Sequence, residues 1–252
     1  MKIGFIITGR MKSTRLPRKL TLPLQGREMI RWMLDRAKLV FNKEDIVIAT
    51  STNPQDDILE QIAIEENVKI FRGDEDDVVS RLYSAAIDNG FDYLINITAD
   101  CPLFGYDYVK KIEQIILAEQ PDLVTSLDLP HGFFVYAIRT EAFKKVIEIK
   151  KTNETEVWGD YFYSNPGIFK ISKLDVSNEE RRIYRLTIDY PEDFKLFEEI
   201  FRYFGENTYK TSSKDILEYL DSNPAIAELN KSCNQKYKER WEAQKAIKIE
   251  KK

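Results

Sequence analysis

Five basic side chains fall within ten residues of this 252-residue chain, directly after an apolar run from Ile3 to Ile7. No acidic residue interrupts the stretch, and small or hydroxylated residues separate the cations. The cations are Arg10, Lys12, Arg15, Arg18 and Lys19, and the spacers include Gly9, Ser13 and Thr14. A loop of this kind gathers backbone N–H groups and cations around an anion, and its glycine permits close approach. We therefore interpret it as a phosphate-binding loop rather than as a solvated basic loop.

Two carboxylates occupy comparable places further along the chain. Asp100 follows the apolar run Tyr93 to Thr98, and Asp189 follows the apolar run that ends at Ile188. A carboxylate at the carboxyl end of a strand is well placed to hold a hard cation such as Mg²⁺. Asp100 is too far from the helix expected near Tyr106 to cap it, so we favour a metal role. For Asp189, a helix cap before Pro191 is an equally good interpretation.

The elements that must position these residues alternate between strand and helix from residue 1 to about residue 120. This alternation predicts an α/β fold of three layers, α/β/α, with a mainly parallel sheet and a mixed edge. Right-handed crossovers would bring the strand-end loops to one rim of the sheet. Further strands are expected at Ile168 to Ile171 and Arg185 to Ile188, and a single long helix is expected from Pro224. We expect a domain over residues 1–222, with an acceptor-side or dimer-side segment at about 127–172, and a helical extension over residues 223–252.

Composition limits the possible classes of protein. The formal net charge of −4 gives no reason to expect nucleic acid as a partner. Cys101 and Cys233 lie far apart, which favours reduced thiols and a cytoplasmic protein. One histidine and two cysteines do not make a usual structural zinc site. The apolar start is too short for a signal peptide, no membrane span follows, and the Walker and dinucleotide glycine patterns are both missing.

The basic loop, R-M-K-S-T-R-L-P-R-K, resembles the signature loop of the spore coat polysaccharide biosynthesis protein F family. That family consists of nucleotidyltransferases related to the CMP-sialic acid and CMP-Kdo synthetases. T-A-D-C-P-L from Thr98 and R-L-T-I-D-Y-P-E-D from Arg185 are similar to its metal-binding segments, with Ala99 in place of the common glycine. The matches run from about Lys2 to Phe197. The resemblance implies a glycosyltransferase-A-like fold and a CTP-dependent cytidylyltransferase that releases pyrophosphate.

The same resemblance implies roles for individual residues. Arg10 and Lys19 would hold the triphosphate as catalytic residues, and Asp100 and Asp189 would bind Mg²⁺. The other nucleotide-binding residues would be Thr8, Gly9, Ser13, Arg15, Thr50, Ser51, Arg72 and Arg81. Arg72 and Arg81 lie among nearby acids, so weak surface ion pairs are the alternative for them.

The half of the chain expected to bind the acceptor departs from the family pattern. P-H-G-F-F-V-Y-A-I from Pro130 and E-T-E-V-W-G-D-Y from Glu154 lack two acids and a histidine of that pattern, and they gain His131 and Trp158. We predict that His131 and Trp158 bind a small anionic acceptor, either an acidic sugar or a phosphorylated or phosphonate metabolite. For His131 a turn residue is the alternative, and for the aromatic segment around Trp158 it is a dimer surface.

The resulting prediction is an enzyme that serves surface polysaccharide or capsule biosynthesis and acts as a homodimer, without nucleic acid or membrane partners. Two other classes remain open. A glycosyltransferase of the same fold would want an Asp-x-Asp metal pair, whereas this chain has Asp100-Cys101-Pro102. A non-catalytic nucleotide-binding regulator would lose metal ligands, whereas both candidate acids are present.

Overall fold

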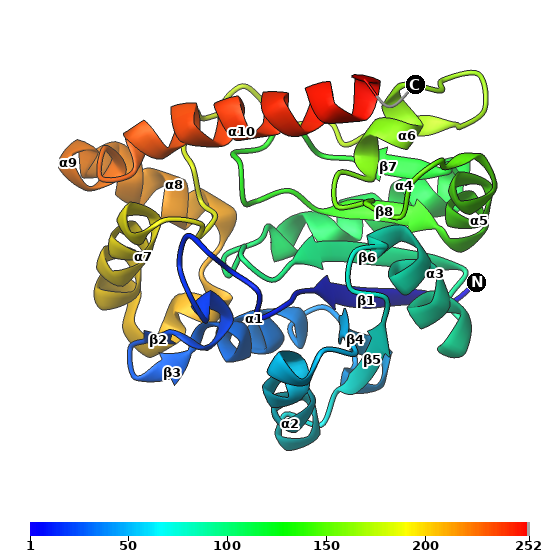
Figure 1. The fold of residues 1–252 in the computed structure, drawn as a ribbon. Coiled ribbons are helices and arrows are strands. Elements are labelled where there is room, and N and C mark those ends of the chain that lie inside the picture. Colours follow the sequence, from blue (N-terminus) through cyan, green and yellow to red (C-terminus); the bar gives the residue numbers. More distant parts are fainter. Residues whose placement is uncertain (251–252) are drawn as a thin grey trace.

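A computed structural model describes the backbone of residues 1–250 and the side chains of residues 1–242 (Figure 1). Within these residues, seven strands form one sheet in the order β5-β4-β1-β6-β8-β7-β9, and β2 and β3 form a separate short hairpin. The strands are β1 (Ile3–Thr8), β2 (Pro23–Leu24), β3 (Arg27–Glu28), β4 (Ile46–Ser51), β5 (Lys69–Gly73), β6 (Tyr93–Thr98), β7 (Leu123–Thr125), β8 (Tyr136–Arg139) and β9 (Ile171–Lys173).

Helices cover both faces of the sheet. The α-helices are α1 (Met29–Ala37), α2 (Asp57–Glu65), α3 (Val78–Asp88), α4 (Val109–Glu119), α5 (Thr140–Ile149), α6 (Gly159–Tyr163), α7 (Pro191–Phe204), α8 (Ser213–Ser222), α9 (Pro224–Ala227) and α10 (Lys231–Glu250). Short 3₁₀ turns are η1 (Lys19–Thr21), η2 (Lys43–Asp45), η3 (Pro54–Asp56), η4 (Tyr106–Tyr108) and η5 (Gly205–Lys210). The single helix expected from Pro224 is wrong, because α9 and α10 are separate. No helix in the described part of the chain is long and apolar enough to cross a membrane.

The order and direction of the strands bring the candidate site residues to one edge. β1 pairs in parallel with β4 on one side and with β6 on the other, and β4 pairs in parallel with β5. The carboxyl ends of these strands therefore meet at one rim. Beyond β6 the sheet changes direction, because β8 is antiparallel to both β6 and β7. The three-layer α/β fold and its mixed edge are confirmed.

The strand expected from Arg185 to Ile188 is wrong. This segment forms a single bridge between Arg185 and His131. Its backbone N–H groups bond to loops instead of a strand: Leu186 donates to the His131 carbonyl at 2.6 Å, and Ile188 donates to the Asp100 carbonyl at 2.8 Å. The expected strand at Ile168 to Ile171 begins only at Ile171, where β9 starts. Loop pairing of this kind delivers Asp189 to the rim beside Asp100.

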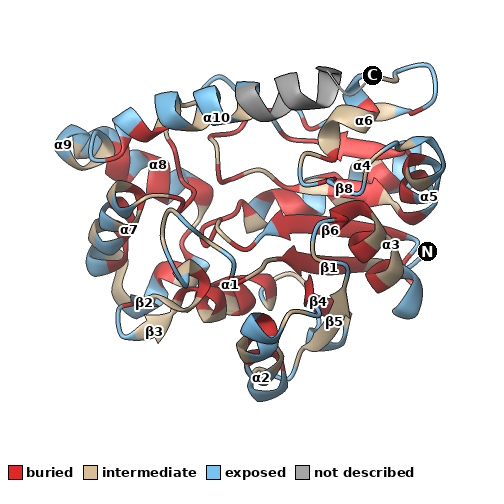
Figure 2. Cartoon of the chain, in the orientation of Figure 1, coloured by how far each residue is buried: buried red, intermediate tan, exposed pale blue. Residues whose placement is uncertain are grey.

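Alternation along the central strands builds the two faces of the core. Phe5 and Ile7 point into a cluster under α1, α2, α4, α7 and α8, whereas Ile6 points into a cluster under α3, α5 and α6. All three side chains are fully buried, and each contributes about 1.5–3 kcal/mol of burial free energy. Figure 2 shows the central strands in the colour of buried residues, with exposed residues on the outer sides of the helices.

The aromatic segment around Trp158 belongs to the second core cluster. Trp158 is 8% exposed and meets Tyr136, Phe143 and Phe162 edge to face. Phe162 is fully buried by its own chain. The alternative that these two aromatics form a dimer surface is therefore wrong.

Candidate active site

The basic loop is fixed at its start by strand β4. Gly9 donates its N–H to the Ala49 carbonyl at 3.2 Å, and Met11 donates to Asp56 Oδ1 at 2.7 Å. A Cβ atom added at Gly9 would lie 2.5 Å from the Cβ of Ala99, so the loop crosses the end of β6 at a distance that only glycine permits.

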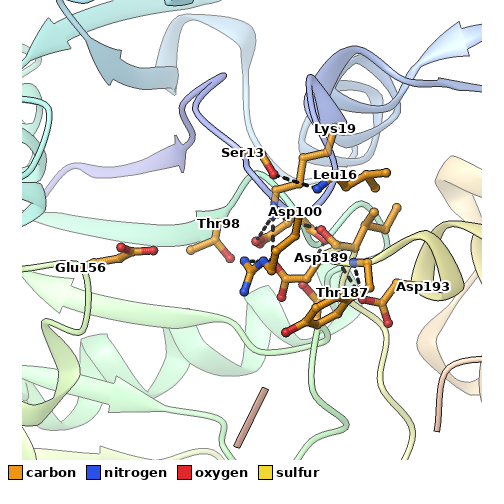
Figure 3. A network of polar contacts seen from close by, with 12 residues as sticks. Ser13, Leu16, Lys19, Thr98, Asp100, Glu156, Thr187, Asp189 and Asp193 are labelled. Carbon is orange, nitrogen blue, oxygen red and sulfur yellow. Dashed lines mark hydrogen bonds and ion pairs between the residues drawn. The ribbon is translucent and has the colours of Figure 1, made fainter. Parts of the chain in front are cut away.

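Lys19 ends this loop and joins the two candidate metal ligands. Its ammonium donates to Asp100 Oδ2 at 2.8 Å, to Asp189 Oδ1 at 3.0 Å and to the Ile188 carbonyl at 3.0 Å. Figure 3 shows Lys19 directed towards both acids, with Thr98 and Glu156 to one side. All three ammonium protons are therefore used, and the carboxylates predicted to lie at one rim are in contact with the same cation.

Neither acid caps a helix. The 3₁₀ turn at Tyr106 is preceded by Gly105, and helix α7 is preceded by Tyr190. Asp193 supplies the carboxylate at the start of α7, where its Oδ2 accepts from the N–H groups of Asp189 and Tyr190 at 2.9 and 3.0 Å. Asp189 is thereby left to accept from side chains, and the helix-cap alternative is wrong for both acids.

Asp189 is surrounded by positive charge. Besides Lys19, it accepts from Arg15 Nη2 at 2.6 Å and from Arg185 Nη2 at 2.8 Å. Arg185 is almost fully buried and also pairs with Asp193 through Nε at 3.0 Å. Three cations thus share the Asp189 carboxylate, and two of them also pair with a second acid, Lys19 with Asp100 and Arg185 with Asp193.

These charges stabilise the ionised forms of Lys19 and Asp100. Burial opposes the charge on Lys19, but Asp100 and Asp189 raise its pKa above its usual range. Burial likewise opposes the charge on Asp100, but Lys19 lowers the pKa of that carboxyl. Burial raises the pKa of the adjacent Cys101 thiol, with the Asp100 charge acting in the same direction, so Cys101 stays a thiol at neutral pH.

A cavity of about 360 Å³ opens beside Lys19. The basic loop and the end of β1 form one wall, consisting of Thr8, Gly9, Arg10, Lys12, Ser13, Thr14, Arg15, Lys19 and Leu20. The end of β6 and the opposite side supply Asn96, Thr98, Ala99, Asp100, Asp76, Val78, Arg81, Glu156, Trp158 and Arg240. A larger hollow of about 600 Å³ lies at the opposite edge of the sheet, near Phe91 and Tyr93, and contains none of the predicted site residues.

Two of the arginines that line this cavity are Arg10 and Arg81. Arg10 donates to the Glu75 carbonyl at 2.6 Å and to Asp76 Oδ1 at 3.2 Å, and it lies 3.9 Å from Glu156. Arg81 is 2% exposed. Among residues 1–242, it bonds only to carbonyl oxygens of Asp74 and Glu75, and its Nε has no hydrogen-bond partner there. Burial first, and then the Arg10 charge, lower the pKa of Arg81 to about 10. A bound anion would stabilise this pair of cations.

Several predicted nucleotide-binding side chains do not reach the cavity. The hydroxyls of Thr50 and Ser51 both donate to the buried carboxylate of Asp56, at 2.9 and 2.5 Å. Arg72 donates to the Ser51 carbonyl at 3.0 Å and pairs with Asp57 at 2.7 Å. These groups stabilise the strand-end loop after β4, and through the Asp56 contact to Met11 they also position the basic loop.

The two predicted acceptor-binding residues separate. Trp158 lines the cavity. His131 is not among the lining residues and packs between Phe134 and Tyr237, with ring centroids 5.4 and 4.8 Å away. Burial first, and then the Arg185 charge, lower the pKa of His131 to about 4, so its ring is neutral at pH 7. A direct contact between His131 and the acceptor is therefore not supported.

Other residues at the site were missed from the sequence. Asp76 and Glu156 place negative charge at the cavity, and Asp56 holds the loop. Asp56 follows Asn53-Pro54-Gln55, where an acid is expected at the start of a helix. Nothing in the sequence therefore indicates separately that its carboxylate is buried and holds the basic loop. Arg240 lies in a highly charged helix whose pattern does not distinguish one basic residue from another.

The donors present fit a hard divalent ion. In the described residues, no group of three or more acids, histidines or cysteines gathers as a metal site. Two carboxylates, those of Asp100 and Asp189, nevertheless converge on one cation, the Lys19 ammonium. Mg²⁺ takes few protein carboxylates and completes its shell with phosphate and water, so Asp100 and Asp189 suffice as a donor set.

The α/β sheet, with a basic loop, two acids and a cavity at its carboxyl edge, has the nucleotidyltransferase fold of a solved cytidylyltransferase. The chain belongs to the cytidylyltransferase family, whose sequence profile matches residues 4–230. The protein is therefore an enzyme, a nucleotidyltransferase.

Individual relatives agree with this assignment. The chain is 27% identical to the spore coat polysaccharide biosynthesis protein SpsF of Bacillus subtilis, over 89% of this chain and 96% of that protein. It is 31% identical to the uncharacterized protein MJ1063 of Methanocaldococcus jannaschii, over 94% of this chain and 97% of that one. A cytidylyltransferase from Leptospira borgpetersenii superimposes with a TM-score of 0.84 at 28% identity, covering 90% of this chain and 97% of that structure. A CMP:2-keto-3-deoxy-manno-octonic acid synthetase complexed with CTP shares the fold, with a TM-score of 0.62 at 17% identity over 81% and 99% of the two chains.

Proposed function

We propose that this protein transfers CMP from CTP to a small anionic acceptor and releases pyrophosphate, in the biosynthesis of a surface polysaccharide or capsule. The observation that carries the proposal is the convergence of Arg10, Arg15, Arg81 and Lys19 on one cavity beside Asp100. Four cations in a partly buried cavity suit a triphosphate. The family and the CTP complex of a structural relative support cytidine as the nucleoside.

In the proposed reaction, an oxygen of the acceptor attacks the α-phosphorus of CTP. The bond from that phosphorus to the bridging oxygen breaks, and pyrophosphate takes the electron pair. Arg10, Arg15 and Lys19 stabilise the negative charge that moves onto the leaving group. The cavity walls align the two reactants, which supplies much of the remaining rate enhancement. An acceptor that is already a phosphate or carboxylate needs no strong general base, consistent with the neutral, packed His131.

Asp100 and Asp189 would hold the Mg²⁺ that accompanies the nucleotide. The ion supplies charge neutralisation at the phosphates when it is bound. Lys19 contacts both carboxylates and so stabilises their ionised forms. Arg185 holds the second oxygen of Asp189 and fixes the orientation of that carboxylate.

A direct assay tests the proposal. Pyrophosphate release is measured with CTP, UTP, ATP and GTP against a panel of phosphorylated, phosphonate and acidic-sugar acceptors, and mass spectrometry identifies the product. We expect release with CTP and one class of acceptor, giving a CMP-linked product. Transfer of a sugar from a nucleotide sugar, without pyrophosphate release, would identify a glycosyltransferase instead. Nucleotide binding without turnover against the whole panel would favour a regulator.

A further inference from the structure

The start of the C-terminal helix α10 is bonded to residues that contact Asp189. Just before it, Asn230 donates to the Arg185 carbonyl at 2.9 Å and to Asp193 Oδ1 at 2.8 Å. Within its first turns, Cys233 is fully buried and Lys236 pairs with Glu192 at 3.0 Å. Figure 1 shows α10 running along one side of the molecule from α9 towards α6. These contacts with Arg185, Glu192 and Asp193 fix the start of α10 relative to Asp189.

One face of α10 points at the site. The Tyr237 ring lies 4.8 Å from that of His131, and the Arg185 guanidinium carbon lies 5.1 Å from its centre. Arg240 is three residues further along and so shares this face. It contributes to the lining of the same cavity as Lys19, Glu156 and Trp158. Helix α10 thus supplies this cavity with a cation that does not belong to the basic loop.

Arg240 differs from the other basic residues that line the cavity in its hydrogen-bond and ion-pair partners. Arg10, Lys12, Arg15 and Lys19 all pair with carboxylates, and Arg81 bonds to backbone carbonyls. Arg240, by contrast, has no hydrogen bond or ion pair with any residue whose side chain the structure describes. An arginine of this kind has all its donors available for a ligand.

We propose that Arg240 binds the anionic group of the acceptor. This inference rests on the proposed function. The triphosphate has its own cations on the basic loop, whereas Arg240 comes from helix α10 and lines the cavity together with Trp158. A guanidinium binds phosphate, phosphonate or carboxylate through two parallel hydrogen bonds. The family profile ends at residue 230, before α10 begins, so Arg240 is suited to set the acceptor specificity of this particular chain.

Calorimetric titration of anions into protein saturated with CTP and Mg²⁺ tests the proposal. The probes are inorganic phosphate, methylphosphonate and acetate, and bound CTP blocks the basic loop. We expect phosphate or methylphosphonate to bind the unmodified protein, Arg240→Ala to weaken this binding about 10-fold or more, and Arg240→Lys to weaken it less. Lys238→Ala is the matched control, since it removes a charge from the same helix at a position that is also exposed but does not line the cavity, and it should leave binding unchanged.

The affinity for CTP, measured separately, distinguishes a failure of the role proposed for Arg240 from a failure of the proposed function. All four proteins should bind CTP with affinities within about twofold of one another. Undiminished phosphate binding by Arg240→Ala overturns the role of Arg240, and so does an unmodified protein that binds CTP but none of the three anions. Failure of every protein to bind CTP would instead overturn the proposed function. A preference for acetate over phosphate would identify the acceptor group as a carboxylate.

Discussion

At the scale of single residues, the most informative contact is that of Lys19 with two acids. Its ammonium lies 81 residues from Asp100 and 170 residues from Asp189 in sequence, yet within 3.0 Å of both in space. The sequence indicated each partner separately. It could not indicate that one lysine joins them, because a distance between residues so far apart depends on the whole sheet. The same applies to the packing of His131 against Tyr237, since a lone histidine beside a glycine carries no information about a helix a hundred residues later.

Replacing Lys19 by alanine should slow turnover strongly. It removes a charge that stabilises the departing pyrophosphate, and we expect a loss of about 2–4 kcal/mol of transition-state stabilisation. The preference for CTP among the four nucleotides should not change, because Lys19 contacts acids and a backbone carbonyl near the phosphate loop, away from the strand-end loop after β4. Steady-state kinetics with all four nucleotides measure both effects. A changed nucleotide preference would mean that Lys19 reads the base.

Replacing Asp100 by asparagine should abolish turnover while preserving the fold. The variant keeps the size of the side chain but loses one of the two charges proposed to hold Mg²⁺, and chelation of metal by EDTA should have the same effect on the unmodified protein. Asp128→Asn is the matched control, because Asp128 is exposed and, of the side chains that the structure describes, pairs only with Arg181. Circular dichroism checks the fold. Full activity of Asp100→Asn, or of the unmodified protein in EDTA, would contradict the proposed metal site.

At the scale of elements, the parallel half of the sheet was predictable and the irregular half was not. Strands β1, β4 and β6 read as apolar runs separated by helices, so the meeting of their ends at one rim followed from topology alone. The segment from Arg185 to Ile188 has the same apolar composition, but its backbone bonds to loops. Local pattern does not distinguish these two cases, because both bury alternate side chains and satisfy their N–H groups.

Glu66, at the end of α2, bonds to residues of α1 and β3 and to Lys38. This network should make the free energy of unfolding depend on pH. Glu66 accepts from Arg31 of α1 at 2.9 Å, from Arg27 of β3 at 3.1 Å and from Lys38 at 2.7 Å. Burial opposes its charge, but these cations lower the pKa of Glu66 to about 2. Because the folded pKa lies below the unfolded value, the stabilisation is fully present above about pH 4.5 and is lost as the pH falls towards 2.

The variant Glu66→Gln should therefore lower the free energy of unfolding by about 1–2 kcal/mol at pH 7, since solvent screens part of the network. The difference from the unmodified protein should shrink between pH 4.5 and pH 2. Urea unfolding at several pH values measures it, and Glu198→Gln, at an exposed position on α7, serves as the control. A difference that stays constant down to pH 2 would show that the charge of Glu66 is not the cause.

At the scale of the whole molecule, one sheet serves both core clusters. Ile6 and its neighbours Phe5 and Ile7 alternate between the two faces, so neither cluster keeps its strands if the other unfolds. We expect one cooperative thermal transition for the described fold. Phe197→Leu in the first cluster and Phe143→Leu in the second should each destabilise this transition by about 1–2 kcal/mol without dividing it. Differential scanning calorimetry of both variants measures the effect, and a second transition in either one would show that the faces unfold separately.

The close approach of Gly9 to Ala99 has a consequence for the evolution of the chain. A Cβ atom at position 9 would lie 2.5 Å from the Cβ of Ala99 and 2.9 Å from Leu20 Cδ1; the Leu20 side-chain end can shift, whereas the Ala99 methyl group cannot. Substitution at either position is therefore constrained by the residue at the other. A methyl group can appear at position 9 only in a lineage that has already lost the methyl group at position 99. Two sites 90 residues apart should therefore exchange alanine and glycine as a pair, and the order of the two substitutions in any lineage is fixed by which residue holds the methyl first.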